Sequence, residues 1–231
     1  MRIILKLKAL KDFAYDKKYY SKLRGFIYDL MRESKYFNKH DKEHYKFFCY
    51  SNIFPVQSIR TGELRNLIIS SPDADFIRFL FGRLAEIQQF KKPIFVGESM
   101  FALDSISYTK PFIRERTKLI TGTPIILRIP QENYAAYGID SKRPYEYWRP
   151  EHDFNAFLKQ ISNNLLKKYN QYYNEDIQSL DIFEMFKFKR SVCVHRIEEG
   201  REIETVGSLW EFQFSHLDEM KRKMLWLGLE S

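Results

Sequence analysis

The fold of this chain is constrained chiefly by the order in which the spacing of its apolar residues changes between a strand-like and a helical period. In the N-terminal half, stretches that alternate apolar and polar residues give way twice to stretches with helical spacing. A period of two is typical of strands, and apolar residues three and four positions apart are typical of helices. This half is therefore predicted to run strand, helix, strand, strand, helix, strand, which is the order of a ferredoxin-like split βαβ unit.

Three strands and the first helix of this half come from short stretches. Arg2 to Leu10 alternates as a half-buried strand, and residues 46–56 and 63–71 are predicted as two more. A helix is expected from Tyr19 to Glu33. Its apolar stripe is made by Leu23, Phe26, Ile27, Leu30 and Met31. Tyr28 falls about 60° beyond the edge of that stripe, so its side chain should point away from the centre of the core.

The second helix of this half is predicted to begin at residues 71–73, with Pro72 in the first helical position. Its apolar face consists of Phe76, Ile77, Leu80, Leu84 and Ile87. Residues 91–108 then supply one or two strands.

The C-terminal half repeats the order without obvious repetition of sequence. Residues 118–129 are predicted as a strand, and Pro150 to Tyr169 as a helix with Phe154, Phe157, Leu158, Ile161 and Leu165 on one face. Residues 183–197 and 201–215 form a hairpin that turns at Glu199-Gly200, and residues 217–229 form a helix. The expected closing strand is absent, because the chain stops at Ser231.

These patterns together predict an α+β fold of two tandem ferredoxin-like βαββαβ domains, the second without its C-terminal strand. The first domain is predicted to span residues 1–112 and the second residues 113–231, with the seam between Lys110 and Lys118.

Charge and composition narrow the function classes. The chain of 231 residues carries 38 basic and 30 acidic residues, a net charge of +8, which favours a polyanion and nucleic acid first. No apolar run approaches the roughly 20 residues that span a bilayer, and the N-terminus is unlike a secretory signal. Only Cys49 and Cys193 occur, so we expect no disulfide framework and a reducing cytoplasm.

The stretch from Asn38 to Ser51 contains the side chains that are most informative about function. His40 and His44 have the spacing of a metal pair, with Cys49 nearby, but no further ligand motif completes a zinc site. Two histidines in a polar loop are also common as solvated surface residues. The remaining interpretation is acid–base catalysis on RNA, whose 2′-hydroxyl is the nucleophile.

Tyr28, His40 and Lys46 would supply the groups that such catalysis needs. Histidine transfers protons near neutral pH, lysine stabilises extra charge on a phosphate, and tyrosine donates, accepts or orients a proton. They belong to a helix, the following loop and the next strand, which can converge at one edge of a ferredoxin-like domain. A metal-dependent nuclease would instead need a carboxylate cluster, and Asp41 and Glu43 are the only acids near this site.

Several strings in this order resemble the CRISPR-associated repeat-cleaving endoribonucleases, the sixth family of Cas proteins, of archaeal type and within the RAMP superfamily. The strings are RGFIYDLM on the first helix, HDKEHYKFFCYS, TGTPIILRI, YWRPEHDFNAFLKQISNNLLKKY and EMKRKMLWLGLES. The similarity extends over essentially the whole chain. It implies a metal-independent endoribonuclease, without a cofactor, that binds the repeat of a CRISPR precursor transcript and cuts it once.

The resemblance also implies roles. Tyr28 would be the general base or orienter, His40 the general acid and Lys46 the group that stabilises the phosphorane, with His44 as the alternative acid. The products would be a 2′,3′-cyclic phosphate and a 5′-hydroxyl. The family ends in a glycine-rich loop and a closing strand, and this chain stops where that loop would begin. Phosphate capture by glycine amides is therefore not expected there.

Basic side chains beyond this site are expected to contact the RNA, although any one of them would also pass as ordinary solvated surface. They are Lys110, Arg114, Arg116, Lys118, Lys187, Lys189, Arg190, Arg196, Arg201, Lys221, Arg222 and Lys223. The alternative function is a non-catalytic RNA-binding protein of the same fold. The expected partner is CRISPR repeat RNA, while an effector ribonucleoprotein complex and a homodimer stay open and no membrane is expected.

Overall fold

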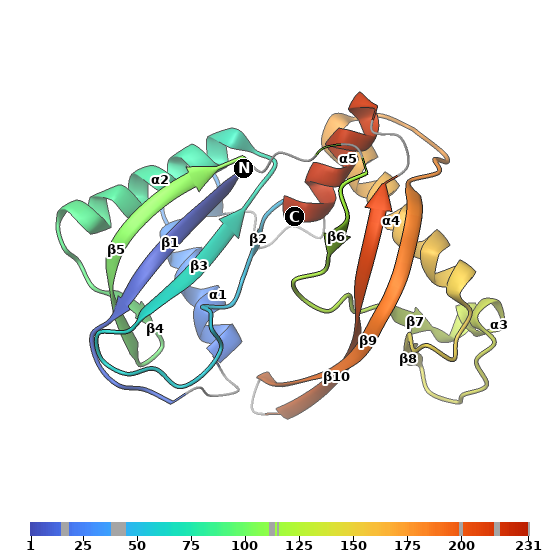
Figure 1. Cartoon of the computed structure of the whole chain (residues 1–231), viewed down its shortest axis with the longest axis horizontal. Coiled ribbons are helices and arrows are strands. Elements are labelled where there is room, and N and C mark those ends of the chain that lie inside the picture. The colour runs from blue at the N-terminus through green and yellow to red at the C-terminus, as the bar shows by residue number, and fades with distance from the viewer. Residues whose placement is uncertain are drawn as a thin grey trace. The chain divides into compact units, whose positions relative to one another are not determined.

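A computed structural model describes residues 1–14, 19–37, 45–110, 114, 116–198, 201–214 and 218–230 (Figure 1). The chain divides into two compact units. The first unit comprises Met1–Phe112 with Trp226–Ser231, and the second comprises Ile113–Leu225. Each unit is described by itself.

The first unit is built on one antiparallel five-stranded sheet in the order β2-β3-β1-β5-β4. Its strands are β1 (Arg2–Ala9), β2 (Cys49–Tyr50), β3 (Leu64–Ser70), β4 (Ile94–Val96) and β5 (Ser99–Thr109). Without β4, which extends the edge as the hairpin partner of β5, the order is that of a ferredoxin-like βαββαβ domain. The predicted order of elements in this half is confirmed.

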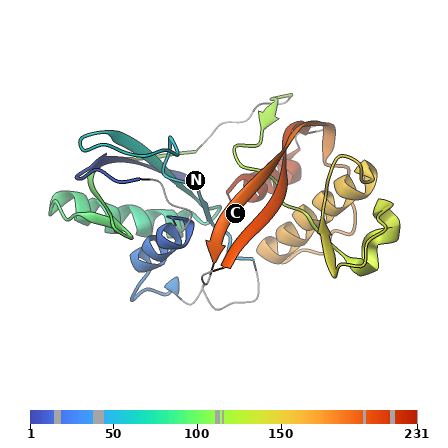
Figure 2. The same ribbon diagram turned by 90° about the horizontal axis from the view of Figure 1, so that it is seen from below.

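Both helices of this unit, α1 (Tyr19–Leu30) and α2 (Ala74–Gln89), lie on the same face of the sheet (Figure 2). The alternation in β1 explains why, since Ile3, Leu5 and Leu7 are fully buried while Lys6 and Lys8 are exposed. All five residues of the apolar stripe predicted for α1 are buried in the same core. Four of the five predicted for α2 are buried, and Ile87 is packed at the margin.

The structure corrects two predictions in this unit. The strand expected over residues 46–56 is only Cys49–Tyr50: Phe47 before it has a positive φ of 50°, and after it Phe54 joins β3 only through an isolated bridge to Asn66. The α2 helix begins at Ala74 rather than at Pro72. Asp73 is its N-cap, and its side chain accepts hydrogen bonds of 3.0 Å from the amides of Asp75 and Phe76.

The second unit has a three-stranded antiparallel sheet in the order β6-β10-β9, and a separate pair of strands, β7 and β8. The strands are β6 (Leu119–Ile120), β7 (Arg128–Pro130), β8 (Tyr145–Tyr147), β9 (Phe183–Glu198) and β10 (Arg201–Phe214). The helices are the 3₁₀ turn η2 (Gln131–Asn133), α3 (Tyr134–Tyr137), α4 (Phe154–Tyr173) and the part of α5 (Glu219–Glu230) that ends at Leu225.

The order β6, α4, β9, β10, α5 follows the ferredoxin-like plan, with β10 between β6 and β9. Within the described part of the chain, β6 pairs with β10 on one side and with no strand on the other. The long β9–β10 hairpin is confirmed, with Arg201 opposite Glu198, although the predicted turn at residues 199–200 lies outside the described residues.

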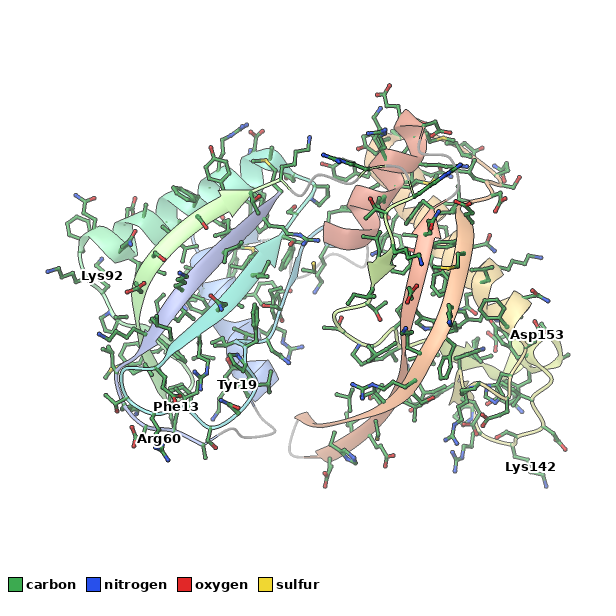
Figure 3. All side chains as sticks on the ribbon, viewed as in Figure 1. Phe13, Tyr19, Arg60, Lys92, Lys142 and Asp153 are labelled. Carbon is green, nitrogen blue, oxygen red and sulfur yellow. The ribbon has the colours of Figure 1, made fainter. Side chains whose placement is uncertain are left out.

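Two predictions in this unit are wrong. Residues 118–129 do not form one strand: β6 and β7 belong to different sheets, and Ile125 between them bridges to Ser208. The helix predicted from Pro150 begins at Phe154 instead, because Asp153 caps it with a 2.7 Å hydrogen bond from the Ala156 amide (Figure 3).

An aromatic cluster forms the core of the second unit. Phe157 of α4 stacks on Trp210 of β10 with 4.7 Å between ring centroids, and Trp148 lies 5.2 Å from Trp210. Phe186 and Phe188 of β9 pack against the same cluster. The α4 helix therefore covers the aromatic face of the hairpin, and the opposite face carries the alternate, polar residues of β9.

Candidate functional site

Tyr28 lies where its position on the α1 helix predicts, beside the buried stripe and not within it. The side chain is half-buried. Its ring packs edge-on against Phe48, with 6.2 Å between centroids and planes at 87°. Because Phe48 is itself only 8% exposed and belongs to the core, the Tyr28 ring is supported on one side and its hydroxyl is left at the surface.

Lys46 is positioned by the two residues that follow it. Phe48 is anchored in the core, and Phe47 adopts a left-handed backbone conformation with φ at 50°. The carbonyl of Phe47 accepts a 2.6 Å hydrogen bond from the hydroxyl of Ser71, which is fully buried. The backbone next to Lys46 is therefore held from inside the unit while the lysine side chain stays exposed.

The two side chains meet. The Nζ of Lys46 donates a hydrogen bond of 3.1 Å to the hydroxyl of Tyr28 and lies 5.6 Å from the centre of its ring. An ammonium group beside a phenol oxygen combines a positive charge with a group that can accept, donate or orient a proton. The contact brings together two of the three residues predicted to be catalytic, and their catalytic role stays a prediction.

The predicted proton carriers cannot be placed beside this pair. His40, His44, Asp41 and Glu43 lie outside the described residues, which resume at Tyr45. A zinc site made of the two histidines with Cys49 therefore also stays untested.

The open face of the first unit's sheet carries exposed cations that are not among the RNA contacts predicted from the sequence. Lys6 and Lys8 of β1 are exposed on the face opposite the helices. Lys6 is paired in register with Asn66 on one side and Ser105 on the other. The alternation of basic and apolar residues from Arg2 onward was the signal that could have identified them.

The second unit's sheet also has a basic face. Lys187 and Lys189 of β9 are exposed and alternate with the inward-facing Phe186 and Phe188, as predicted. Lys189 donates a 3.0 Å hydrogen bond to Glu211 of β10, and this bond is the main reason why the pKa of Glu211 is lowered. Attraction to Lys189, Lys118 and Lys187 contributes to the same pKa shift, so these three predicted cations gather around one carboxylate.

The other predicted cations are scattered over both units. Those with exposed side chains are Lys110, Arg114, Arg116, Arg190 and Arg222. Lys221 is half-exposed. Arg196 and Arg201 lie on the hairpin, but their side chains are outside the description.

Lys223 has an internal role. Its Nζ lies 3.0 Å from Glu219, one turn earlier on α5, and 5.3 Å from the centre of the Tyr173 ring. The hydrogen bond with Glu219 raises the pKa of Lys223. Lys223 thus binds a carboxylate and an aromatic ring of its own unit, and its contact with RNA stays a prediction.

Neither Cys49 nor Cys193 is part of a disulfide. One group of potential metal ligands occurs among the described residues, and sequence reasoning did not single it out. It consists of Cys193, His195 and Glu204 on the β9–β10 hairpin, in the other unit from Tyr28 and Lys46. None of the helices in the described ranges has both the length and the apolar composition needed to cross a membrane.

Comparison with known proteins supplies an independent line of evidence. Residues 108–231 match the family model described as "CRISPR associated protein Cas6, C-terminal". The chain is 30% identical over 222 residues to the CRISPR-associated endoribonuclease Cas6 2 of Methanocaldococcus jannaschii, covering 91% of this chain and 84% of that protein. It is 29% identical over 242 residues to the CRISPR-associated endoribonuclease Cas6 of Haloferax mediterranei, covering 100% and 88%.

The fold has solved counterparts. A structure described as "CRISPR associated protein Cas6" superposes with a TM-score of 0.68 at 21% identity, over 100% of this chain and 92% of that one. At this level of identity the likeness concerns the fold, and it agrees with two tandem ferredoxin-like domains.

Proposed function

The chain belongs to the Cas6 family of CRISPR-associated endoribonucleases, and from this premise we propose that it binds the repeat of a CRISPR precursor transcript and cleaves it at one site without a metal ion. The observation that carries the proposal is the 3.1 Å hydrogen bond from Lys46 to Tyr28. It brings together two groups of the predicted catalytic set from positions 18 residues apart.

The proposed reaction is an internal transfer within the RNA. Tyr28 takes, or orients for removal, the proton of a 2′-hydroxyl, whose oxygen attacks the adjacent phosphorus. The bond from phosphorus to the 5′-oxygen breaks, and His40, or His44 in its place, gives that oxygen a proton. The products are a 2′,3′-cyclic phosphate and a 5′-hydroxyl, so the atoms balance with no added reactant.

Lys46 has two tasks in this scheme. Its ammonium stabilises the extra negative charge of the phosphorane, which is a transition-state interaction of the kind that contributes most to catalysis. Through the hydrogen bond to Tyr28 it also fixes where the phenol oxygen lies before the substrate arrives. A site that is organised in advance spends less of the binding energy on ordering its own side chains.

The RNA is proposed to bind the basic open faces of both sheets. Lys6 and Lys8 would contact phosphates in the first unit, and Lys118, Lys187 and Lys189 in the second. The remaining cations predicted from the sequence, at residues 110, 114, 116, 190, 196, 201, 221 and 222, would extend these faces. Each phosphate contact that is formed should steepen the dependence of affinity on salt.

The testing experiment is cleavage of an end-labelled CRISPR repeat RNA in excess chelator. Wild type is compared with His40→Ala, His44→Ala and Lys46→Met, and a repeat with a 2′-deoxy nucleotide at the cut site serves as the substrate control. His152→Gln is the protein control, because it removes a histidine from the other unit.

The proposal expects one cut that persists in chelator and disappears with the 2′-deoxy RNA and with Lys46→Met. Loss of activity in only one of the two histidine variants identifies the acid. Tight binding with no cut by wild type would identify a non-catalytic RNA-binding protein instead, and cleavage abolished by chelator would identify a metal-dependent nuclease. The molar mass of the protein with and without RNA tests for a homodimer.

A further inference from the structure

The β9–β10 hairpin gathers three different metal-ligating side chains on one face. Cys193 and His195 lie two residues apart on β9, so they project to the same side of the ribbon. Glu204 of β10 is directly opposite His195 in the strand register. Residues opposite each other in an antiparallel pair have Cβ atoms about 4.5–5.5 Å apart, which brings their side chains within reach of a common ion.

The ligand atoms are already close together. The Sγ of Cys193 lies 3.0 Å from an oxygen of Glu204 and 3.5 Å from the Nε2 of His195. All three ligand atoms lie within 4.8 Å of one another. Donors bound to one tetrahedral zinc ion at its usual bond lengths are about 3.5 Å apart. The observed spacing therefore needs only small side-chain rotations to surround an ion.

A fourth residue provides a second, independent indication. The Nδ1 of His195 lies 3.8 Å from an oxygen of Glu202, while its Nε2 faces Cys193. A histidine that binds a metal through one ring nitrogen commonly directs its other nitrogen to a carboxylate, which fixes the ring and makes it a better ligand. Glu202 stands in the place of that carboxylate, and it is two residues before Glu204 on the same face of β10.

We propose that Cys193, His195 and Glu204 bind one divalent transition-metal ion of the zinc class, with the fourth coordination position open to water or a ligand. A thiolate and an imidazole select borderline-soft ions such as Zn²⁺ and Co²⁺ over Mg²⁺ and Ca²⁺, which prefer oxygen ligands. Binding replaces the proton of the Cys193 thiol by the metal and releases that proton to the solvent. All three side chains are exposed, so an ion has direct access.

The position of the site on the hairpin suggests that the ion stabilises the pairing of β9 with β10. Among the described residues, β6 pairs with Glu211 and Phe212, and the part of the ribbon with the three ligands has strand pairing between β9 and β10 only. A two-stranded ribbon is marginally stable by itself. An ion bound to both strands would tie them together. The site is separate from the proposed cleavage chemistry, so cleavage in chelator does not test it.

The test is titration of the metal-free, reduced protein with Co²⁺, followed by competition with Zn²⁺ against a chromophoric chelator. Tetrahedral Co²⁺ gives visible ligand-field bands, and a thiolate ligand adds a charge-transfer band in the near ultraviolet. We expect one equivalent to bind, with both signals, and Zn²⁺ to displace the Co²⁺.

Variants separate a built site from adventitious binding. Cys193→Ser should abolish the charge-transfer band, and His195→Gln and Glu204→Gln should each weaken Zn²⁺ binding at least tenfold. Glu202→Gln should weaken it by about 10- to 100-fold. Cys49→Ser, which removes the other cysteine of the chain, should bind as wild type does.

The proposal is overturned if no charge-transfer band appears, or if that band depends on Cys49 rather than Cys193. Because the ligands are exposed, these substitutions should leave the circular dichroism spectrum unchanged, so loss of binding is not confused with loss of folding.

Discussion

The hydroxyl of Ser71 donates a 2.6 Å hydrogen bond to the carbonyl of Phe47, and thereby ties the segment around Lys46 to the end of β3. The same hydroxyl accepts a 3.1 Å hydrogen bond from the amide of Asp73, the N-cap of α2. A fully buried serine thus connects the proposed site to the start of a helix.

Ser71→Ala should reduce both stability and cleavage. It leaves the Phe47 carbonyl and the Asp73 amide without their partner, which should cost about 1–3 kcal/mol in the free energy of unfolding. A displaced Lys46 should lower the single-turnover cleavage rate between about tenfold and 100-fold, since small misplacements of catalytic groups have effects of this size. Ser141→Ala, the same change in the other unit, should leave cleavage unaltered. Equal cleavage by both variants would contradict the positioning role.

Tyr28 and Lys46 should act as one unit. Tyr28→Phe keeps the ring against Phe48 and removes only the hydroxyl that accepts the Lys46 hydrogen bond. Each single variant, Tyr28→Phe or Lys46→Met, should lower the single-turnover rate by about 100-fold or more. The double variant should be little worse than the poorer single one, because groups that act together are not additive. Fully additive losses in the rate would show that the two side chains work independently.

The buried guanidinium of Arg65 should make Glu63 important for folding. The Arg65 side chain is 5% exposed, and its Nη2 lies 2.6 Å from Glu63, which is 41% exposed. Removing one partner of a buried ion pair leaves the other charge buried without compensation, which lowers the free energy of unfolding. Replacing the buried residue with an apolar one often changes that free energy little. Glu63→Gln should therefore lower the urea midpoint of unfolding more than Arg65→Leu does. The reverse order would mean that hydrogen bonds from Arg65 to the carbonyls of Leu64 and Ser58 dominate.

Asp12 should contribute to the loss of folding stability of the protein at acid pH. Its Oδ1 accepts 2.6 Å hydrogen bonds from the hydroxyl and the amide of Thr61, and these lower its pKa. The unfolded chain therefore binds a proton at this carboxyl more readily than the folded chain does. The resulting stability is present above the ordinary aspartate pKa of about 4 and is lost as pH falls through the lower folded value.

Urea unfolding of wild type and Asp12→Asn between about pH 2 and pH 6 would measure this effect. The substituted protein should show a shallower loss of stability in acid. Thr61→Val, which keeps the backbone donor and removes the hydroxyl, should lie between the two. If the stability of wild type and of Asp12→Asn fell in the same way with decreasing pH, Asp12 would not be the group responsible.

Much of the first unit could be predicted because its apolar periods are undisturbed. The buried stripe of α1 and the position of Tyr28 beside it depend only on 3.6-residue periodicity, and both are as expected. The contact between Tyr28 and Lys46 could be anticipated as convergence of two elements, but its 3.1 Å geometry depends on the Ser71 hydrogen bond and the Phe47 conformation. Neither the Ser71 hydrogen bond nor the Phe47 conformation produces a periodic pattern in the sequence.

Predictions failed where tertiary contacts override local pattern. The apolar run of residues 118–129 suits one strand, but Gly207 of β10 lets Pro124 and Ile125 approach so closely that a Cβ there would lie 2.7 Å from Pro124. The segment bridges to Ser208 at this point and then continues as β7, which pairs with β8. The local sequence of these residues does not indicate which strand each part of the segment will pair with.

The metal-ligand cluster was accessible to sequence reasoning in principle. The turn predicted at residues 199–200 implies a register in which Glu204 lies opposite His195, and the two residues are paired in this way. Alternation already places Cys193 on the same face as His195. No contiguous metal-binding motif marks the cluster, because its three ligands come from two strands.

The β9–β10 ribbon runs in unbroken register from the Glu198–Arg201 pair to the Arg190–Leu209 pair, before the first irregularity. Shortening both strands of that stretch by two residues would retract its tip by about 7 Å and keep every remaining side chain on its original face. Shortening both by one would turn the tip over and exchange its two faces. The reach of this arm is thus adjustable only in even increments, which sets the lengths at which homologous or engineered hairpins can present the same chemistry.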